Sequence, residues 1–201
     1  MNKTELKKTY THQSDEQLAE ACRAHDHAAF QELMHRYMRH IFHFARQYAK
    51  TSEDADDIAQ DTFYKVWKYI KKYTKNRSFK PWLYTIARNT ALDFLKKKKA
   101  IVFSDIDDLE NDLHFTDTLE DPAPLASEVF ENAAFIKKLQ AALGTIHPDH
   151  RAILLLHYRE NMTFDEIAKI VGRPMNTVKS WHRRALMRLR AEVEKKEKKR
   201  K

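Results

Sequence analysis

The chain has 201 residues and only two glycines, whereas average usage would give roughly 14. Glycine supplies the positive-φ turns of phosphate-binding loops and β-hairpins, so nucleotide-cradling motifs and hairpin-rich sheets are excluded and an all-α fold is expected. The longest apolar run, Ala152 to Leu156, is far shorter than the roughly 18 residues of a transmembrane helix, so no membrane insertion is expected. The single Cys22 and the absence of an apolar N-terminal signal predict a cytoplasmic protein.

Charge is segregated along the chain. Residues 100–131 contain no Lys or Arg and have a net charge of −10, whereas residues 1–99 and 132–201 have net charges of +8 and +10. This pattern predicts two small basic helical domains, 14–99 and 132–195, joined by a flexible acidic linker, 100–131. Nucleic acid is the expected partner of the basic domains. The linker is either a solvated tether or a mimic of nucleic acid that occupies a basic channel in a partner.

Three helices with apolar stripes are predicted in the first domain. The first begins at a capping-box sequence, Ser14 to Gln17, and extends to about Lys50 with a break near His25. The second begins at Ser52, and its side chains Phe63 and Trp67 are expected in the core of the domain.

The second helix also carries an acidic stripe. Asp54, Asp57 and Asp61 follow one another at i, i+3 and i+7, with Gln60 and Tyr64 beside them. These carboxylates either form a solvated face that complements the helix dipole or dock onto a basic protein surface. The spacing alone does not decide between the two interpretations.

The third helix is predicted to have Pro81 at its first position, after a basic loop. Its expected outer face presents hydrogen-bonding and basic side chains: Arg88, Asn89, Asp93 and Lys96, followed by Lys97, Lys98 and Lys99. Four aromatic residues surround the loop: Tyr73, Phe79, Trp82 and Tyr84. For Trp82 and Tyr84, burial in the core and stacking on unpaired bases remain equally open.

The second domain has the pattern of a helix-turn-helix module. Two scaffold helices, 135–146 and one that begins at Pro148, precede a capping box at Thr163 and a short helix that stops at Gly172. The last helix sorts into a predicted buried stripe of Val178, Ala185, Leu186 and Leu189, and an exposed group of Lys179, Ser180, Arg183 and Arg184. That exposed group is placed as in a recognition helix that enters the major groove.

Five segments resemble, in order and spacing, the two domains of a bacterial RNA polymerase sigma factor of the extracytoplasmic-function group. They are 54–67 and 79–91 in the first domain, and 163–168, 176–180 and 183–186 in the second. The resemblance implies that the linker threads through the polymerase toward the RNA exit channel. It also implies core RNA polymerase and promoter DNA, both duplex and melted, as partners, with an anti-sigma factor as a possible third.

The resemblance further implies roles for individual residues. Core polymerase, through the coiled coil of its largest subunit, would be bound by Asp54, Asp57, Gln60, Asp61 and Tyr64. The minus-ten element would be recognised and melted by Lys80, Trp82, Tyr84, Arg88, Asn89, Asp93, Lys96 and Lys97, with Asn89 placed to accept a flipped base. The minus-thirty-five element would be read by Lys179, Ser180, Arg183 and Arg184. Trp181 and Asn176 stand where the family often has Arg and Gly, so the exact minus-thirty-five sequence does not carry over.

Two other functions are compatible with parts of this sequence. A stand-alone helix-turn-helix regulator would share the second domain but would not need polymerase. A nucleic-acid enzyme or metal sensor is prompted by the 11 histidines, but H-E-x-x-H and C-x-x-C spacings are absent from the sequence. No catalytic residue, metal or cofactor is therefore expected.

Overall fold

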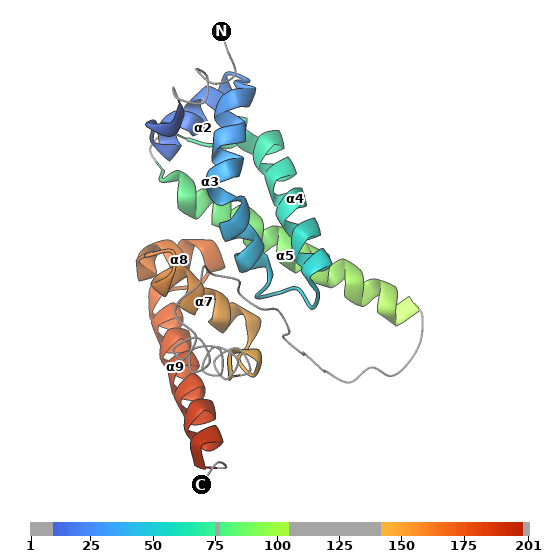
Figure 1. Ribbon diagram of the computed structural model, residues 1–201, viewed down its shortest axis with the longest axis vertical. Coiled ribbons are helices and arrows are strands. Elements are labelled where there is room, and N and C mark those ends of the chain that lie inside the picture. Colours follow the sequence, from blue (N-terminus) through green and yellow to red (C-terminus); the bar gives the residue numbers. More distant parts are fainter. Residues whose placement is uncertain (1–9, 75–76, 105–141, 199–201) are drawn as a thin grey trace, which may run out of the picture. The chain divides into compact units, whose positions relative to one another are not determined.

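A computed structural model describes residues 10–74, 77–104 and 142–198, and every regular element within those ranges is a helix (Figure 1). The elements in chain order are α2 (Asp15–Arg23), α3 (His27–Ala45), α4 (Ser52–Tyr69), the 3-10 helix η1 (Ile70–Lys72), α5 (Phe79–Ser104), α7 (Pro148–Tyr158), α8 (Phe164–Val171) and α9 (Met175–Lys198). They belong to two compact units, the first built on α2 to α5 and the second on α7 and α9. The all-α fold predicted from the sequence is confirmed. None of the described helices is long and apolar enough to cross a membrane.

The helix break that the sequence predicts near His25 separates α2 from α3. Ser14 caps α2 in a reciprocal capping box with Gln17. His25 then adopts a φ of 66°, in the left-handed region, and ends the first segment. The Asp26 carboxylate accepts hydrogen bonds from the backbone N–H groups of Ala28 and Ala29 and starts α3.

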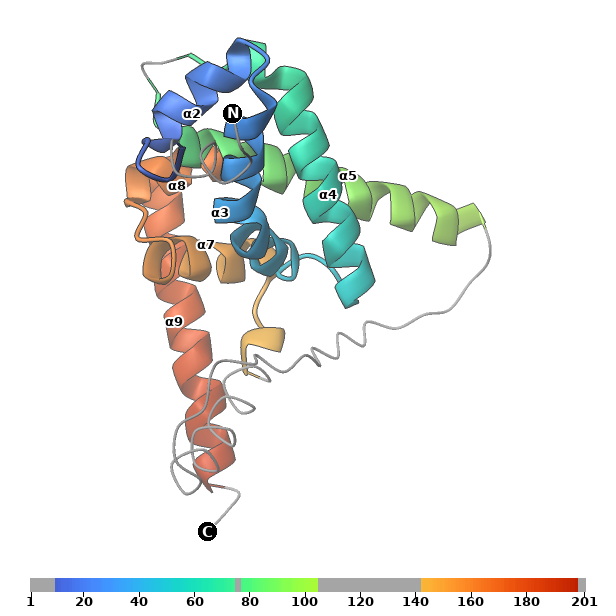
Figure 2. The ribbon, with the colours of Figure 1, turned by 45° about the horizontal axis from the view of Figure 1, so that its top comes forward.

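Helix α3 forms the centre of the first unit. It packs against α2, α4 and α5, and Figure 2 shows α3 and α4 side by side with α5 crossing them. The residues at the centre of this packing are fully buried: Leu33, Ile41, Phe44, Ile58 and Leu83. Their burial fixes α4 relative to α5, the two helices that carry the residues singled out in this unit.

Helix α5 differs from the expectation at both ends. It begins at Phe79, so Pro81 is its third residue and not its first. Proline is still tolerated there because the first N–H groups of a helix have no intrahelical partner; the Phe79 N–H donates instead to Glu16 Oε1 at 3.2 Å. The helix continues to Ser104, five residues beyond the boundary predicted at residue 99. The remainder of the predicted acidic linker lies outside the described residues.

The segment that connects α7 to α9 confirms the predicted turn of the helix-turn-helix. The Thr163 hydroxyl accepts the Glu166 N–H at 3.3 Å, and Glu166 Oε2 accepts the Thr163 N–H at 2.8 Å, which completes the capping box of α8. Gly172 has a φ of +63° and nothing lies within 4 Å of the position of a Cβ. Backbone conformation, not space, therefore favours glycine at this turn.

Helix α9 packs against α7 with a narrower apolar stripe than predicted. Val178 and Ala185 are buried, and Leu189 packs beside a cluster that includes Ile146. Leu186 is 37% exposed, so its assignment to the buried stripe was wrong. It follows Ala185 directly, and one residue turns a helix by about 100°, which carries Leu186 away from α7. The predicted scaffold helix over 135–146 is described only from Ala142 onward.

Candidate functional site

The acidic stripe of α4 is exposed over most of its length. Asp57, Gln60, Asp61 and Tyr64 all face solvent, and Tyr64 is 62% exposed. The Asp61 carboxylate is 2.9 Å from Lys65 Nζ, an i,i+4 pair on the same helix. A helix surface with exposed carboxylates and an exposed ring can contact a basic protein partner.

Asp54 does not share this exposure. Its side chain is 15% exposed, and both carboxylate oxygens contact Lys98 Nζ, at 2.7 and 2.9 Å. The prediction that Asp54 lies on an open stripe with Asp57 and Asp61 therefore needs correction. Asp54 faces α5 because it stands in the first turn of α4, where α5 passes close enough for Lys98 to reach it.

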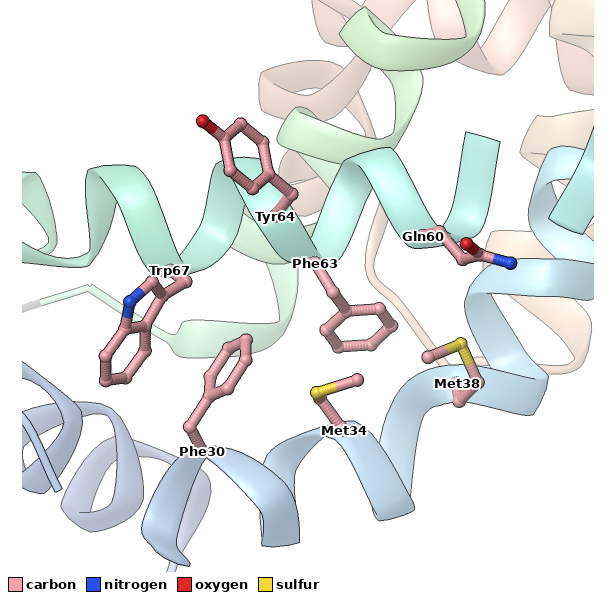
Figure 3. A pocket seen from close by; sticks show the side chains of 7 residues that line it. All are labelled: Phe30, Met34, Met38, Gln60, Phe63, Tyr64 and Trp67. Carbon is pink, nitrogen blue, oxygen red and sulfur yellow. The ribbon is translucent and has the colours of Figure 1, made fainter. Parts of the chain in front are cut away.

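An apolar groove of about 250 Å³ runs between α3 and α4 beside the acidic stripe. Figure 3 shows its lining residues: Phe30, Met34, Met38, Gln60, Phe63, Tyr64 and Trp67. Gln60 and Tyr64 thus belong both to the stripe and to the groove. The acidic stripe and the apolar groove together form one continuous surface, which we call the docking surface.

Sequence reasoning did not find this groove, because it assigned Phe63 and Trp67 to the core. Phe63 is buried, but Trp67 is only half-buried, with its ring 4.9 Å from that of Phe30 and 4.8 Å from that of His27. The sequence did contain a signal for the groove. The apolar stripe of α3 is broad, and Phe30 and Met34 widen it beyond the surface that one neighbouring helix can cover.

The aromatic residues at the start of α5 divide into core and surface. Tyr73, Phe79 and Tyr84 are each at most 1% exposed. The Tyr84 ring packs edge-on against Phe44, with centroids 5.2 Å apart. A ring enclosed in this way cannot stack on a base, so the DNA-binding assignment of Tyr84 was wrong. Trp82 alone of the four is half-buried, and it rests on Tyr73 with ring centroids 5.4 Å apart.

The outer face of α5 continues from Trp82. Asn89, Asp93 and Lys96 follow it at intervals of seven, four and three residues and are exposed, and so is Lys97. Arg88 and Lys80 are half-buried and lie on other sides of the helix. The structure thus brings Trp82, Asn89, Asp93 and Lys96 onto one face, but not Arg88 or Lys80.

Helix α9 presents a basic face opposite Val178. Lys179, Arg183 and Arg184 are exposed and Ser180 is half-buried. Trp181 turns toward its own unit, where its ring centroid lies 5.1 Å from that of His150. The guanidinium of Arg173, in the turn before α9, lies 6.0 Å from the Trp181 ring centroid. Sequence reasoning did not single out Arg173, which lies just before the N-terminal end of α9.

The histidines and the single cysteine form no metal site within the described ranges. No group of three His, Cys, Asp or Glu side chains able to hold a metal ion occurs among the residues that the structure describes. Cys22 is buried, and desolvation raises the pKa of its thiol to about 12, so it stays protonated and unreactive at neutral pH.

Comparison with known proteins identifies both units. The sigma-70 region 2 family matches residues 33–101, and the sigma-70 region 4 family matches residues 136–189. The extracytoplasmic-function (ECF) sigma factor SigM of Mycobacterium tuberculosis is 31% identical over 176 residues, which cover 88% of this chain and 83% of that protein. The ECF sigma factor SigE of Mycolicibacterium smegmatis is 27% identical over 162 residues, 81% of this chain but only 60% of that longer relative.

A solved structure shows the same fold. The sigma factor RpoE from Bartonella quintana, co-crystallised with the anti-sigma factor NepR, has a TM-score of 0.65 at 23% identity, and the match covers 82% of this chain and 96% of that one. Sigma factors direct RNA polymerase to promoters in transcription initiation, and as a family they are not enzymes. The chain belongs to the extracytoplasmic-function family of RNA polymerase sigma factors.

Proposed function

We propose that the docking surface binds core RNA polymerase, at the coiled coil of the largest subunit, as the family resemblance implies. The exposed carboxylates of Asp57 and Asp61 favour a basic partner. The exposed Tyr64 ring and the apolar groove beside it supply the desolvated contact area on which stable association depends. Gln60 lies between these two features and can hydrogen-bond at their boundary. Asp54 contributes only once its pairing with Lys98 is exchanged for a contact with the partner.

The outer face of α5 is proposed to bind the minus-ten element in its melted form. The amide of Asn89 both donates and accepts hydrogen bonds, which suits the edge of a flipped base. Trp82 can stack on an unpaired base, and the ammonium groups of Lys96 and Lys97 suit phosphates. In this scheme the free energy of melting comes from binding the flipped bases and requires no nucleotide hydrolysis.

The basic face of α9 is proposed to read the minus-thirty-five element as a duplex. Arg183 and Arg184 can reach the O6 and N7 atoms of guanine, while Lys179 and Ser180 can contact phosphates or base edges. Since Trp181 packs against His150, it supports the helix and does not read bases.

An anti-sigma factor is a further proposed partner, because RpoE of Bartonella quintana was solved in complex with one. The chain is proposed to act in the cytoplasm, where core polymerase transcribes. A stand-alone regulator would bind promoter DNA equally well without polymerase, whereas the proposed function requires it.

The observation that carries the proposal is that the acidic stripe and the apolar groove meet at Gln60 and Tyr64. Replacing Asp57 and Asp61 together by lysine should weaken association with core polymerase by about tenfold or more, since it reverses the charge of the stripe. Comigration of the purified chain with core polymerase measures this, and circular dichroism checks that helicity is intact.

The control is Asp56→Lys, which makes the same type of substitution, with half the charge change of the double variant, at an exposed position of α4 outside the stripe. It should retain comigration. Undiminished binding by the double variant would remove α4 from the interface. If wild-type protein left promoter-specific transcripts unaffected when added to core polymerase, the proposed function itself would fail.

A further inference from the structure

Helix α2 supplies a carboxylate to the first turn of α5. Glu16, in the first turn of α2, accepts the backbone N–H of Phe79 at 3.2 Å, across a separation of 63 residues. Phe79 is the first residue of α5, and the first N–H groups of a helix have no partner within the helix. The helix dipole also favours a negative charge at this end. Glu16 therefore satisfies and orients the start of α5 from a different helix.

The start of α5 carries Trp82, which follows Phe79 closely in the same helix. Their ring centroids lie 5.8 Å apart, and both rings pack against Tyr73, at 5.8 Å for Phe79 and 5.4 Å for Trp82. Tyr73 is 1% exposed, and burial raises the pKa of its hydroxyl, followed by the negative charge of Glu16. The carboxylate thus lies beside this aromatic cluster, and a shift of the Phe79 backbone would move Trp82.

The first turn of α2 is itself held in place by α3. Asp15, next to Glu16, forms an ion pair with Arg36 at 2.9 Å and accepts a hydrogen bond from the Tyr37 hydroxyl. The Arg36 guanidinium makes five hydrogen bonds, one for each of its N–H donors; the acceptors are the carboxylates of Glu32 and Asp15 and the backbone carbonyls of Tyr10, Thr11 and Gln13. A planar guanidinium with every donor engaged is held in one geometry. Glu16 is therefore presented to α5 from a rigid support.

Apolar packing of α2 does not require a carboxylate at position 16. Leu18, Ala19 and Cys22 are fully buried and hold the helix against its unit. The helix also lies before residue 33, where the match to sigma-70 region 2 begins, so that match assigns α2 no role. Glu16 adds direction to these apolar contacts, because its hydrogen bond fixes where α5 begins.

We propose that Glu16 is a positioning residue for binding of the melted minus-ten element, acting through the Phe79 N–H to hold Trp82 where an unpaired base can stack. Glu16 does not touch DNA itself. This inference rests on the proposed function of the outer face of α5, and it adds α2 as the element that sets the geometry of that face. An amide keeps an acceptor oxygen, so Glu16→Gln should preserve the positioning and Glu16→Ala should remove it.

The test uses the full chain assembled with core polymerase and a fluorescein-labelled promoter fragment whose minus-ten bases are unpaired. Measured by fluorescence anisotropy, Glu16→Ala should weaken binding of this fragment by about fivefold, whereas Glu16→Gln should stay within about twofold of wild type. Comigration with core polymerase should be unchanged for both variants, because the docking surface lies on α3 and α4.

The position of Trp82 is measured in the free chain. With the other two tryptophans replaced by phenylalanine, the fluorescence of Trp82 reports its surroundings. Acrylamide should quench this fluorescence more readily in the Glu16→Ala variant than in wild type, and Glu16→Gln should restore the wild-type response. Unchanged quenching in Glu16→Ala would mean that Glu16 does not hold Trp82, and the inference would fall.

Two control variants separate positioning from a loss of stability. Glu20→Ala removes a carboxylate one turn later on α2, where the partner is Arg23 of the same helix at 3.0 Å. Ser14→Ala removes the hydroxyl that caps α2, which destabilises the helix but leaves the Glu16 carboxylate in place. Both variants should bind the unpaired promoter fragment within about twofold of wild type. An equal loss in Ser14→Ala and Glu16→Ala would reduce Glu16 to a stability effect and overturn the inference, as would loss of comigration in Glu16→Ala.

Trp82→Ala separates this inference from the proposed function on which it rests. If Trp82→Ala weakens binding of the unpaired fragment and Glu16→Ala does not, the role of α2 is excluded while the α5 face stands. If neither variant changes the affinity, both assignments fail. A loss in Glu16→Ala alone would also count against the inference, because Trp82 is the contact that Glu16 is proposed to hold.

Discussion

Asp54 and Lys98, 44 residues apart in sequence, form an ion pair with a shortest N–O distance of 2.7 Å. Asp54 belongs to the residues proposed to bind polymerase, and Lys98 follows Lys96 and Lys97, which are proposed to bind DNA. The pair therefore joins the start of α4 to the outer part of α5. Its Lys98 side chain is 47% exposed, so solvent screens the attraction strongly.

We expect this pair to contribute only modestly to stability. In a double-mutant cycle with Asp54→Asn and Lys98→Gln, the coupling free energy should be about 0.5–1 kcal/mol, as for other exposed pairs. Urea denaturation monitored by circular dichroism measures it. Lys97→Gln, at a neighbouring exposed lysine, should show no coupling to Asp54→Asn. Strictly additive effects of the first two substitutions would mean that the pair does not hold α5 to α4 in solution.

Truncation of Tyr84 should mainly lower stability, whereas truncation of Trp82 should mainly weaken DNA binding. Tyr84 is fully enclosed in the core, but Trp82 is only half-buried. Tyr84→Ala removes a ring packed against Phe44 and should lower the free energy of unfolding by about 3–5 kcal/mol. Trp82→Ala should cost less stability but should weaken binding of the melted promoter strand by about 1–3 kcal/mol. Urea denaturation and open-complex formation with core polymerase provide the two measurements. A folded Tyr84→Ala chain of wild-type stability would contradict its assignment to the core.

Local signals explain why much of the fold could be predicted from the sequence. The capping boxes at Ser14 and Thr163, the break near His25 and the turn at Gly172 each depend on residues within one turn of one another. Periodicity alone also located α4 and α9. These features are fixed by short-range hydrogen bonding and backbone conformation, which sequence spacing reports directly.

Contacts between distant segments could not be predicted in this way. The burial of Tyr84 depends on Phe44, 40 residues earlier, and the ion pair of Asp54 depends on how far α5 extends. The docking groove exists because α4 covers only part of the apolar stripe of α3. Each feature is set by tertiary packing, which spacing along one helix does not encode.

Arg183 is expected to read one base of the minus-thirty-five element. It is exposed on the face of α9 opposite Val178, where a recognition helix meets base edges. Arg183→Ala should cost about 1–3 kcal/mol of binding, confined to a single promoter position. Affinities of holoenzyme for a set of single-base promoter variants would show this.

The control for that measurement is Arg188→Ala, five residues further along α9, where Arg188 Nε is 3.7 Å from Glu192 Oε1. It should leave the base preferences unchanged. A uniform loss over all promoter sequences in the Arg183 variant would instead identify Arg183 as a phosphate contact.

The second unit should lose stability in mildly acidic solution because of His182. Burial lowers the pKa of this imidazole below 6.5, and the nearby His157 lowers it further. The rings of His157, Phe164 and Tyr158 surround it, and its Nε2 lies 3.1 Å from the Tyr158 hydroxyl. The unfolded chain therefore takes up the proton at higher pH than the folded chain, and stability falls as the pH drops through 6.5 toward the folded pKa.

Thermal unfolding measured between pH 7.5 and 5.5 tests this expectation. The fluorescence of Trp181 reports the unfolding, in a chain whose other two tryptophans are replaced by phenylalanine. The midpoint should fall over that range, and His182→Phe should reduce the fall. A smaller dependence should remain, because burial also lowers the pKa of His150, beside Trp181. His12→Gln, in the first unit, should leave the dependence unchanged. An undiminished fall in the His182 variant would show that other groups take up the protons on unfolding.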